Sequence, residues 1–130
     1  MKVLGRPKKA YQISDDVSER EFLATIIDIA HMTGWLVSHQ RPAWTEKGYR
    51  TAIQGDAGFV DLVLLRDRHL IFAELKSSKG KLTADQVHWN VMLCDLSIWA
   101  CRTERDETYF PVRYYTWRPQ DIEKIKAVLR

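Results

Sequence analysis

Two strongly apolar segments, 59–66 and 70–76, stand three residues apart in the middle of the chain. Both are rich in Val, Leu, Ile and Phe, and both have the length of an ordinary β-strand. Only Asp67, Arg68 and His69 separate them, which is enough for a tight turn but too short for a crossover connection. The sequence therefore predicts an antiparallel hairpin around which the rest of the fold is built.

Carboxylates interrupt both of these segments. Asp61 lies inside the first segment, and Glu74 follows four apolar residues of the second. Because side chains alternate between the two faces of a strand, Glu74 and Lys76 share one face. A carboxylate among buried side chains costs free energy unless a cation or hydrogen bonds compensate it. The hairpin is therefore predicted to carry a polar site.

A helix is predicted before the hairpin. Ser18 is a suitable N-cap, Glu21 completes a capping box three residues later, and Gly34 ends the helix. Glu19 lies three residues before Phe22, so helical periodicity places it on the apolar stripe. Glu19 is therefore expected to be a carboxylate aimed at the core, whereas Glu21 is assigned to capping.

Further elements are predicted after the hairpin. Thr83 and Gln86 form a second capping box, which opens a helix to about Leu96, and Pro119 starts a last helix. The remaining predicted strands are 35–39, 97–101 and 110–117, and 41–58 is predicted to be a loop. The expected order is α-β-β-β-α-β-β-α, which indicates an α/β fold with a mixed central sheet flanked by helices.

The N-terminal segment differs from the rest of the chain in charge. The net charge is +3, and the first ten residues contain four basic residues and no acidic one. Residues 5–9 resemble the core of an AT-hook, in which Gly-Arg-Pro lies in a minor groove; a solvated basic tail is the alternative. We predict a basic arm over 1–12 and one folded domain over 13–130. The DNA contacts expected of the arm are Arg6, Lys8 and Lys9.

Composition argues against membrane and disulfide-rich classes. No apolar run approaches the roughly 20 residues of a membrane-spanning helix, and no signal-peptide pattern opens the chain. Cys94 and Cys101 are too few for a disulfide scaffold and lack metal-ligand spacing. We therefore expect a cytoplasmic protein with reduced thiols and no membrane partner.

Asp61, Glu74 and Lys76 carry the predicted chemistry. Two carboxylates on adjacent strands can share a divalent cation, and oxygen ligands with open positions suit Mg²⁺. Such a cation lowers the pKa of a bound water and neutralises charge on a phosphate. Lys76 can orient that water or offset charge in the transition state. The alternative is that Glu74 and Lys76 form an exposed ion pair on an edge strand.

The spacing of Asp61, Glu74 and Lys76 is similar to the signature of the PD-(D/E)XK nuclease superfamily. The segments that narrow the resemblance are 58–64, 71–77, 80–83, Gln86, Trp89 and 117–119. From about 18 to 130, the chain resembles a stand-alone VRR-NUC domain of the kind found in phages and bacteria. This resemblance implies a restriction-endonuclease-like core.

The resemblance also implies the roles of individual residues. The implied catalytic residues are Glu19, Asp61, Glu74, Lys76 and Gln86. The implied ligands of Mg²⁺, for which Mn²⁺ can substitute, are Asp61, Glu74, the backbone carbonyl of Leu75 and, through water, Glu19. Gln86 is equally expected to be the capping partner of Thr83, and these two roles do not exclude each other.

Other polar residues near the predicted site are candidates for DNA phosphate contacts. They are His39, Arg50, Lys79 and Lys81. The alternatives are a structural, hydrogen-bonded histidine and ordinary surface charge.

The predicted function is Mg²⁺-dependent, structure-selective cleavage of DNA. Relatives of this kind resemble Holliday-junction resolvases and act as homodimers, because two sites about a two-fold axis suit symmetric cuts in a four-way junction. Two alternatives remain open: a less selective nuclease that cuts flaps, nicks or linear DNA, and a DNA-binding module that does not cut. A helicase or another replication partner is also compatible with the chain. A phage-encoded protein would act in the host cytoplasm.

Overall fold

The computed structural model describes the backbone of residues 14, 16–40, 43–50, 54–102 and 112–130, and their side chains except at 43–45, 49–50 and 98–102. The predicted basic arm over 1–12 lies outside these residues. Within the part that is described, the fold is α/β, with three α-helices, a four-stranded mixed sheet and a separate two-stranded hairpin. None of the described helices is long and apolar enough to cross a bilayer.

The four-stranded sheet contains the predicted hairpin at its centre. Its strands, in spatial order, are β1 (Leu36–His39), β4 (Leu62–Arg66), β5 (His69–Leu75) and β6 (Val112–Trp117). Strands β4 and β5 are antiparallel and meet at a turn in which Asp67 has a φ of 53°. Strand β1 is antiparallel to β4, and β6 is parallel to β5. The parallel pair needs a crossover, which helix α3 (Ala84–Arg102) provides.

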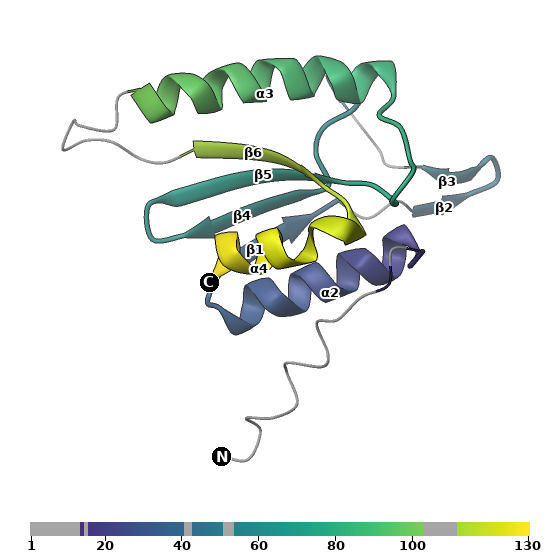
Figure 1. Ribbon diagram of the computed structural model, residues 1–130. Helices are drawn as coiled ribbons and strands as arrows, with labels where there is room; N and C mark the ends of the chain where they lie inside the picture. The colour runs from purple at the N-terminus through teal and green to yellow at the C-terminus, as the bar shows by residue number, and fades with distance from the viewer. Residues whose placement is uncertain (1–13, 15, 41–42, 51–53, 103–111) are drawn as a thin grey trace, which may run out of the picture.

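Helices cover both faces of this sheet (Figure 1). Of the helices in the described residues, α3 lies by itself on one face. Helices α2 (Glu19–Met32) and α4 (Ile122–Leu129) lie on the other, and α4 follows the short 3₁₀ helix η2 (Pro119–Asp121). The predicted start and end of α2 are confirmed: the Ser18 side chain accepts a hydrogen bond from the Glu21 amide at 3.2 Å, and Gly34 has a φ of 88° just beyond the helix.

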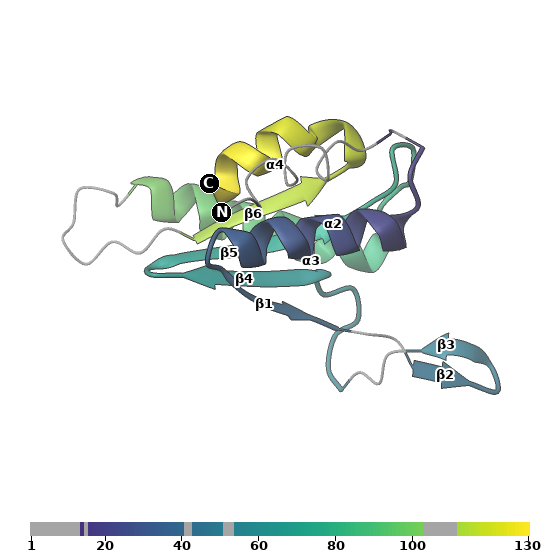
Figure 2. The ribbon, with the colours of Figure 1, turned by 90° about the horizontal axis from the view of Figure 1, so that it is seen from below.

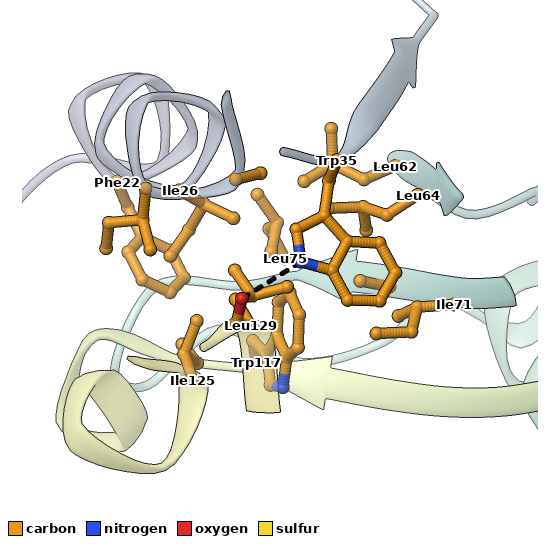
Figure 3. Close-up of a cluster of buried hydrophobic side chains, with 13 residues drawn as sticks. Phe22, Ile26, Trp35, Leu62, Leu64, Ile71, Leu75, Trp117, Ile125 and Leu129 are labelled. Atoms are coloured by element: carbon orange, nitrogen blue, oxygen red, sulfur yellow. Dashed lines mark hydrogen bonds between the residues drawn. The ribbon is translucent and has the colours of Figure 1, made fainter. Parts of the chain in front are cut away.

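The apolar core lies between the sheet and the pair of helices α2 and α4 (Figure 3). Helix α2 contributes Phe22 and Ile26, and α4 contributes Ile125 and Leu129, all of them fully buried. The sheet residues that meet them are Leu62, Leu64, Ile71, Ala73, Leu75 and Trp117. Burial of side chains this large is the main source of stability in a chain of this size.

Polar groups tie the ends of these two helices to the sheet. The guanidinium of Arg66 donates hydrogen bonds to the carbonyls of Thr33, Leu129 and Arg130 at 2.8, 3.1 and 3.0 Å. It also lies 4.5 Å from the centre of the Trp35 ring, whose Nε1 donates to the Leu129 carbonyl at 3.0 Å. The C-cap carbonyl of α2, at Thr33, and the last helical carbonyl of α4, at Leu129, thus accept hydrogen bonds from side chains.

Two expectations for the segment after the second capping box are wrong. The predicted strand 97–101 is the last part of α3, which runs to Arg102 and not to about Leu96. No Gly or Pro interrupts the chain between Ala84 and Arg102, so nothing ends the helix earlier. The order of helices and main-sheet strands is therefore α-β-β-β-α-β-α.

The predicted loop 41–58 contains a small hairpin. Strand β2 (Ala43–Thr45) pairs antiparallel with β3 (Gly48–Arg50), and Glu46 and Lys47 connect them. Gly48 has a φ of 98°, a conformation that favours glycine in a tight turn. This hairpin projects beyond the end of the sheet at which α2 and α3 begin (Figures 1 and 2).

Candidate active site

The predicted site residues lie at the end of the sheet where β5 ends and β4 begins. The antiparallel register pairs Leu62 with Ala73, so Asp61, just before β4, lies close to Glu74. Helices α2 and α3 both begin at this end (Figures 1 and 2). The strand register therefore brings Asp61 and Glu74 together. The first residue of α2 adds Glu19, and the start of α3 adds Gln86.

Asp61 is held by a backbone amide on β5 and by a histidine side chain on β1. Its carboxylate oxygen Oδ2 accepts a hydrogen bond from the Leu75 amide at 2.7 Å. Its backbone carbonyl lies 2.9 Å from Nδ1 of the half-buried His39, at the end of β1. His39, for which a phosphate contact and a structural role were both open, therefore makes a structural hydrogen bond.

Glu74 is the buried carboxylate of the site. Its exposed fraction is 2%, and it is the only buried charged residue in the part of the chain that the structure describes. Burial, together with the neighbouring Asp61 carboxyl group within hydrogen-bonding reach, raises the pKa of Glu74 from 4.5 to about 8, although Lys76 acts in the opposite direction. The expectation that a carboxylate would lie among buried side chains is thus confirmed at Glu74.

Gln86 connects this carboxylate to the start of helix α3. Its Nε2 donates to Oε1 of Glu74 at 2.9 Å, while its own Oε1 accepts from the Thr83 amide at 2.9 Å. The Thr83 hydroxyl in turn accepts from the Gln86 amide at 3.2 Å, which completes the predicted capping box. The capping role of Gln86 is confirmed, and the other end of the same side-chain amide contacts Glu74.

The start of α3 is fixed by a close backbone approach that the sequence did not reveal. Gly58 has a φ of 94°, and a Cβ at this position would lie 2.5 Å from the backbone carbonyl carbon of Asp85. One residue earlier, the Ala57 carbonyl accepts a hydrogen bond from Nε1 of Trp89 at 3.0 Å. Glycine is therefore required here for both conformation and space, and this contact positions Gln86 beside Glu74.

Glu19 reaches the site, but it is not buried as predicted. It is the first residue of α2 and is exposed, whereas the buried stripe of the helix begins at Phe22. A side chain in the first turn extends beyond the helix end and is not covered by a preceding turn. Its Oε1 accepts a hydrogen bond from the Ser77 amide at 3.1 Å, and its charge contributes to the raised pKa of Glu74.

Lys76 is followed by a short loop that Arg118 holds in place. Lys76 is half-buried, and its backbone amide donates to the Trp117 carbonyl at 3.0 Å. Arg118 Nη1 donates to the carbonyls of Ser77 and Gly80 at 2.7 and 2.6 Å. Arg118 is part of the segment 117–119 on which the family resemblance rests. No local signal indicated that its side chain would hold the loop 77–80, which follows the predicted catalytic Lys76.

The predicted DNA contacts are only partly described. Lys79 and Lys81 are exposed on either side of Gly80, where a phosphate could reach them. The side chain of Arg50 lies outside the described residues. So do Arg6, Lys8 and Lys9 of the predicted arm.

A half-buried tyrosine also lies near the carboxylates, and sequence reasoning missed it. Tyr114, on β6 beside Phe72 of β5, shares a hydrogen bond of 2.9 Å with the Thr116 hydroxyl. Burial raises its pKa, and the charges of Glu74 and Asp61 add to the shift. The alternation of β6 could have placed Tyr114 on the α3 face, had the parallel register been known.

Among the described residues, no three His, Cys, Asp or Glu side chains form a group that could bind a metal by themselves. The candidate centre is therefore the pair Asp61 and Glu74, with Lys76 beside it and Glu19 at its edge. Comparison of the chain with known protein families and with curated proteins finds no match.

Proposed function

We propose that this protein is a Mg²⁺-dependent DNA endonuclease with a restriction-endonuclease-like core of the VRR-NUC type. One observation carries the proposal: the carboxyl groups of Asp61 and Glu74 approach each other from neighbouring strands, and Glu74 is buried. Two adjacent carboxylates repel each other unless a proton or a cation lies between them. A purely structural role gives no reason to keep such a pair.

The donor set fits Mg²⁺. This ion is usually held by one or two carboxylates and completes its shell with waters and substrate phosphate oxygens, so a third acidic side chain is not needed. Asp61 and Glu74 would bind it directly, the Leu75 carbonyl would be a further ligand, and Glu19 would act through water. Mn²⁺, which accepts the same oxygen ligands, is expected to substitute.

The surrounding residues would orient this pair. The Leu75 amide holds one oxygen of Asp61, and Gln86 holds one oxygen of Glu74, so both carboxylates have fixed directions. Bound Mg²⁺ supplies a water of lowered pKa and neutralises charge on the phosphodiester. Lys76, which follows the end of β5 and whose charge acts on Glu74, would orient the attacking water or stabilise the charge that develops on the phosphate.

The proposed substrate is branched DNA, cut by a homodimer as a Holliday junction is resolved. Lys79 and Lys81 would contact phosphates beside the site, as would Arg50 and the basic arm. The carboxylate pair argues against a module that only binds, because uncompensated acids repel the DNA backbone.

The decisive experiment is cleavage of a labelled four-way junction and a matched linear duplex, with Mg²⁺ and with EDTA. We expect symmetric nicks in the junction with Mg²⁺ only, and a loss of at least about 100-fold in rate for Glu74→Ala. Glu123→Ala is the matched control, because Glu123 is exposed on α4 and pairs only locally with Lys126 at 2.8 Å.

The other outcomes separate the alternatives. Cutting of both DNAs would retain the nuclease and discard junction selectivity. Tight binding without cutting, with Glu74→Ala equal to the native chain, would contradict the nuclease and favour a binding module or a missing helicase partner.

A further inference from the structure

Helix α3 presents apolar side chains to solvent. Val91 and Met92 have exposed fractions of 61% and 63%, and Val87 and Leu96 are also exposed. Within the described side chains of this helix, only Leu93 is buried. Contiguous exposed apolar residues on a helix commonly indicate a protein interface.

The inner side of the same helix is partly polar. Gln86 faces the sheet through its hydrogen bond to Glu74, and the half-buried Asn90 accepts a hydrogen bond from the Cys94 thiol at 3.1 Å. The usual arrangement, with polar residues toward water and apolar residues toward the sheet, is thus partly inverted. No other described helix or strand covers the outer side of α3 (Figure 1), although Asp56 of the loop before β4 borders it beside His88 and Met92. Packing among the described residues of one chain does not explain this distribution.

The outer side of α3 is complementary to itself. After Ala84 and Asp85 at its start, the exposed residues of α3 fall in three pairs separated by one helical turn: Val87 with His88, Val91 with Met92, and Asp95 with Leu96. Consider a second copy of α3 that lies antiparallel to the first, related by a two-fold axis that crosses the helix between Val91 and Met92. Each exposed apolar residue then meets an apolar residue, and each His88 meets an Asp95. His88 then lies opposite Asp95 of the second copy, Val87 opposite its Leu96, and Val91 opposite its Met92. A two-fold interface requires this reciprocity.

We propose that this surface, the α3 outer face (Val87, His88, Val91, Met92, Asp95 and Leu96), is the contact between two copies of this chain. The apolar pairs supply the buried area, and the two His88–Asp95 pairs fix the antiparallel direction. The inference rests on the homodimer in the proposed function but not on its chemistry. Residue 86 of one copy lies about 16 Å along the axis from residue 86 of the other, so the two sites point to different stretches of DNA.

The test is the molecular mass of the chain in solution, by sedimentation equilibrium from about 1 to about 200 μM. One helix from each copy makes a small interface, so we expect a dissociation constant in roughly the micromolar range. Asp95→Lys places lysine opposite His88, and His88→Asp places aspartate opposite Asp95. Each single variant is expected to raise the dissociation constant at least about tenfold. The double variant His88→Asp/Asp95→Lys places an aspartate opposite each lysine and is expected to restore the dimer.

Controls make the result specific to this surface. Asp28→Lys changes the same charge at an exposed position of α2 and leaves the dimer unchanged. Met92→Glu places a charge beside the proposed axis and dissociates the dimer independently of the swap. Circular dichroism confirms that each variant is folded, as expected for exposed positions.

Three outcomes would overturn the inference, and they differ in what else they affect. A native chain that is monomeric at every concentration would remove this interface and the homodimer, and leave the metal chemistry standing. A dimer indifferent to both single variants and to Met92→Glu would remove only the interface. Dissociation by the single variants without recovery in the double variant would contradict the antiparallel pairing.

Discussion

The two faces of the central sheet are covered differently, although the same strands form both. In β5, Ile71, Ala73 and Leu75 lie in the apolar core under α2 and α4. The alternate residues face α3, where Glu74 meets Gln86 and Phe72 lies in an aromatic contact with Phe59. The first face is dry and apolar, whereas the second combines carboxylates, hydrogen bonds and aromatic rings. The alternation of side chains along β5 thus places the residues of the apolar core on one face and Glu74 of the candidate site on the other.

The largest expected effect comes from neighbouring leucines on opposite faces of β4. Leu64 is fully buried in the core, and Leu65 has an exposed fraction of 42%. We expect Leu64→Ala to lower the free energy of unfolding by about 3 kcal/mol, because it leaves a cavity, and Leu65→Ala by less than about 1 kcal/mol. Urea unfolding measures both. Equal losses would contradict the distinction between the two faces.

A pair of glycines tests how the α3 face is assembled. Gly55 and Gly58 both have a positive φ, of 102° and 94°, but only at Gly58 would a Cβ meet another backbone. Gly55→Ala is expected to cost about 1 kcal/mol from conformation alone, and Gly58→Ala at least about 1 kcal/mol more. Thermal unfolding measures this difference. Because Gly58 lies against the start of α3, Gly58→Ala should also weaken Mg²⁺ binding. If Gly55→Ala lowered stability and Mg²⁺ affinity by the same amounts, the close approach at Gly58 would be unimportant.

Glu74 makes the stability of the metal-free chain depend on pH. Its pKa is about 8 in the folded protein, above the ordinary value of 4.5, so the folded state holds a proton that the unfolded state releases. Stability contributed by this group is complete below about pH 4.5 and is lost as pH rises toward about 8. We expect a melting temperature in EDTA that falls by roughly 5 °C over this range because of Glu74.

Glu74→Gln is the matched variant for this pH dependence. It keeps the shape of the side chain and removes the titration, so its melting temperature should decrease less over the same range. Mg²⁺ should raise the melting temperature of the native chain at about pH 8, where a cation can replace the proton, and should not raise that of the variant. Identical pH profiles for the two chains would contradict the shifted pKa.

The smallest expected effect concerns the start of α2. This helix packs on the apolar face of the sheet, and its first residue, Glu19, reaches the candidate site. Ser18→Ala removes the N-cap hydrogen bond and should cost about 1 kcal/mol. Since Glu19 is the next residue, fraying there should also loosen its contact with the Ser77 amide. Ser38→Ala, at an exposed position of β1, is the control and should change stability by less than about 0.5 kcal/mol in urea unfolding.

Local signals predicted most of the fold. The capping residues Ser18 and Thr83 begin their helices as expected, and the β4–β5 hairpin follows from two apolar segments with a short connection. Such signals depend only on neighbouring residues, so they are readable without a structure. The helical end of α3 was missed because Ser97, Trp99 and their neighbours have similar preferences for helix and strand, and only the absence of a helix breaker distinguishes them.

The candidate site was predicted where residue type and strand alternation suffice, as for Asp61 and Glu74. It was not predictable where a contact joins distant segments. The clamp of Arg118 on Ser77 and the close approach of Gly58 to Asp85 depend on tertiary placement, which no periodicity encodes. The burial expected for Glu19 was wrong for a related reason, because periodicity describes the middle of a helix and not its first turn.

The parallel pairing of β5 with β6 has a consequence for how the chain folds. Strands β4 and β5 pair through close neighbours in sequence, but Leu70 pairs with Val112 on the far side of helix α3. Long-range pairing of this kind is slow because loop closure precedes any gain from contacts. Asp61 and Glu74 belong to the early antiparallel part, and Gln86 belongs to the late crossover. We therefore expect the carboxylate pair to form before its amide partner arrives, so that the last folding step both closes the sheet and completes the site.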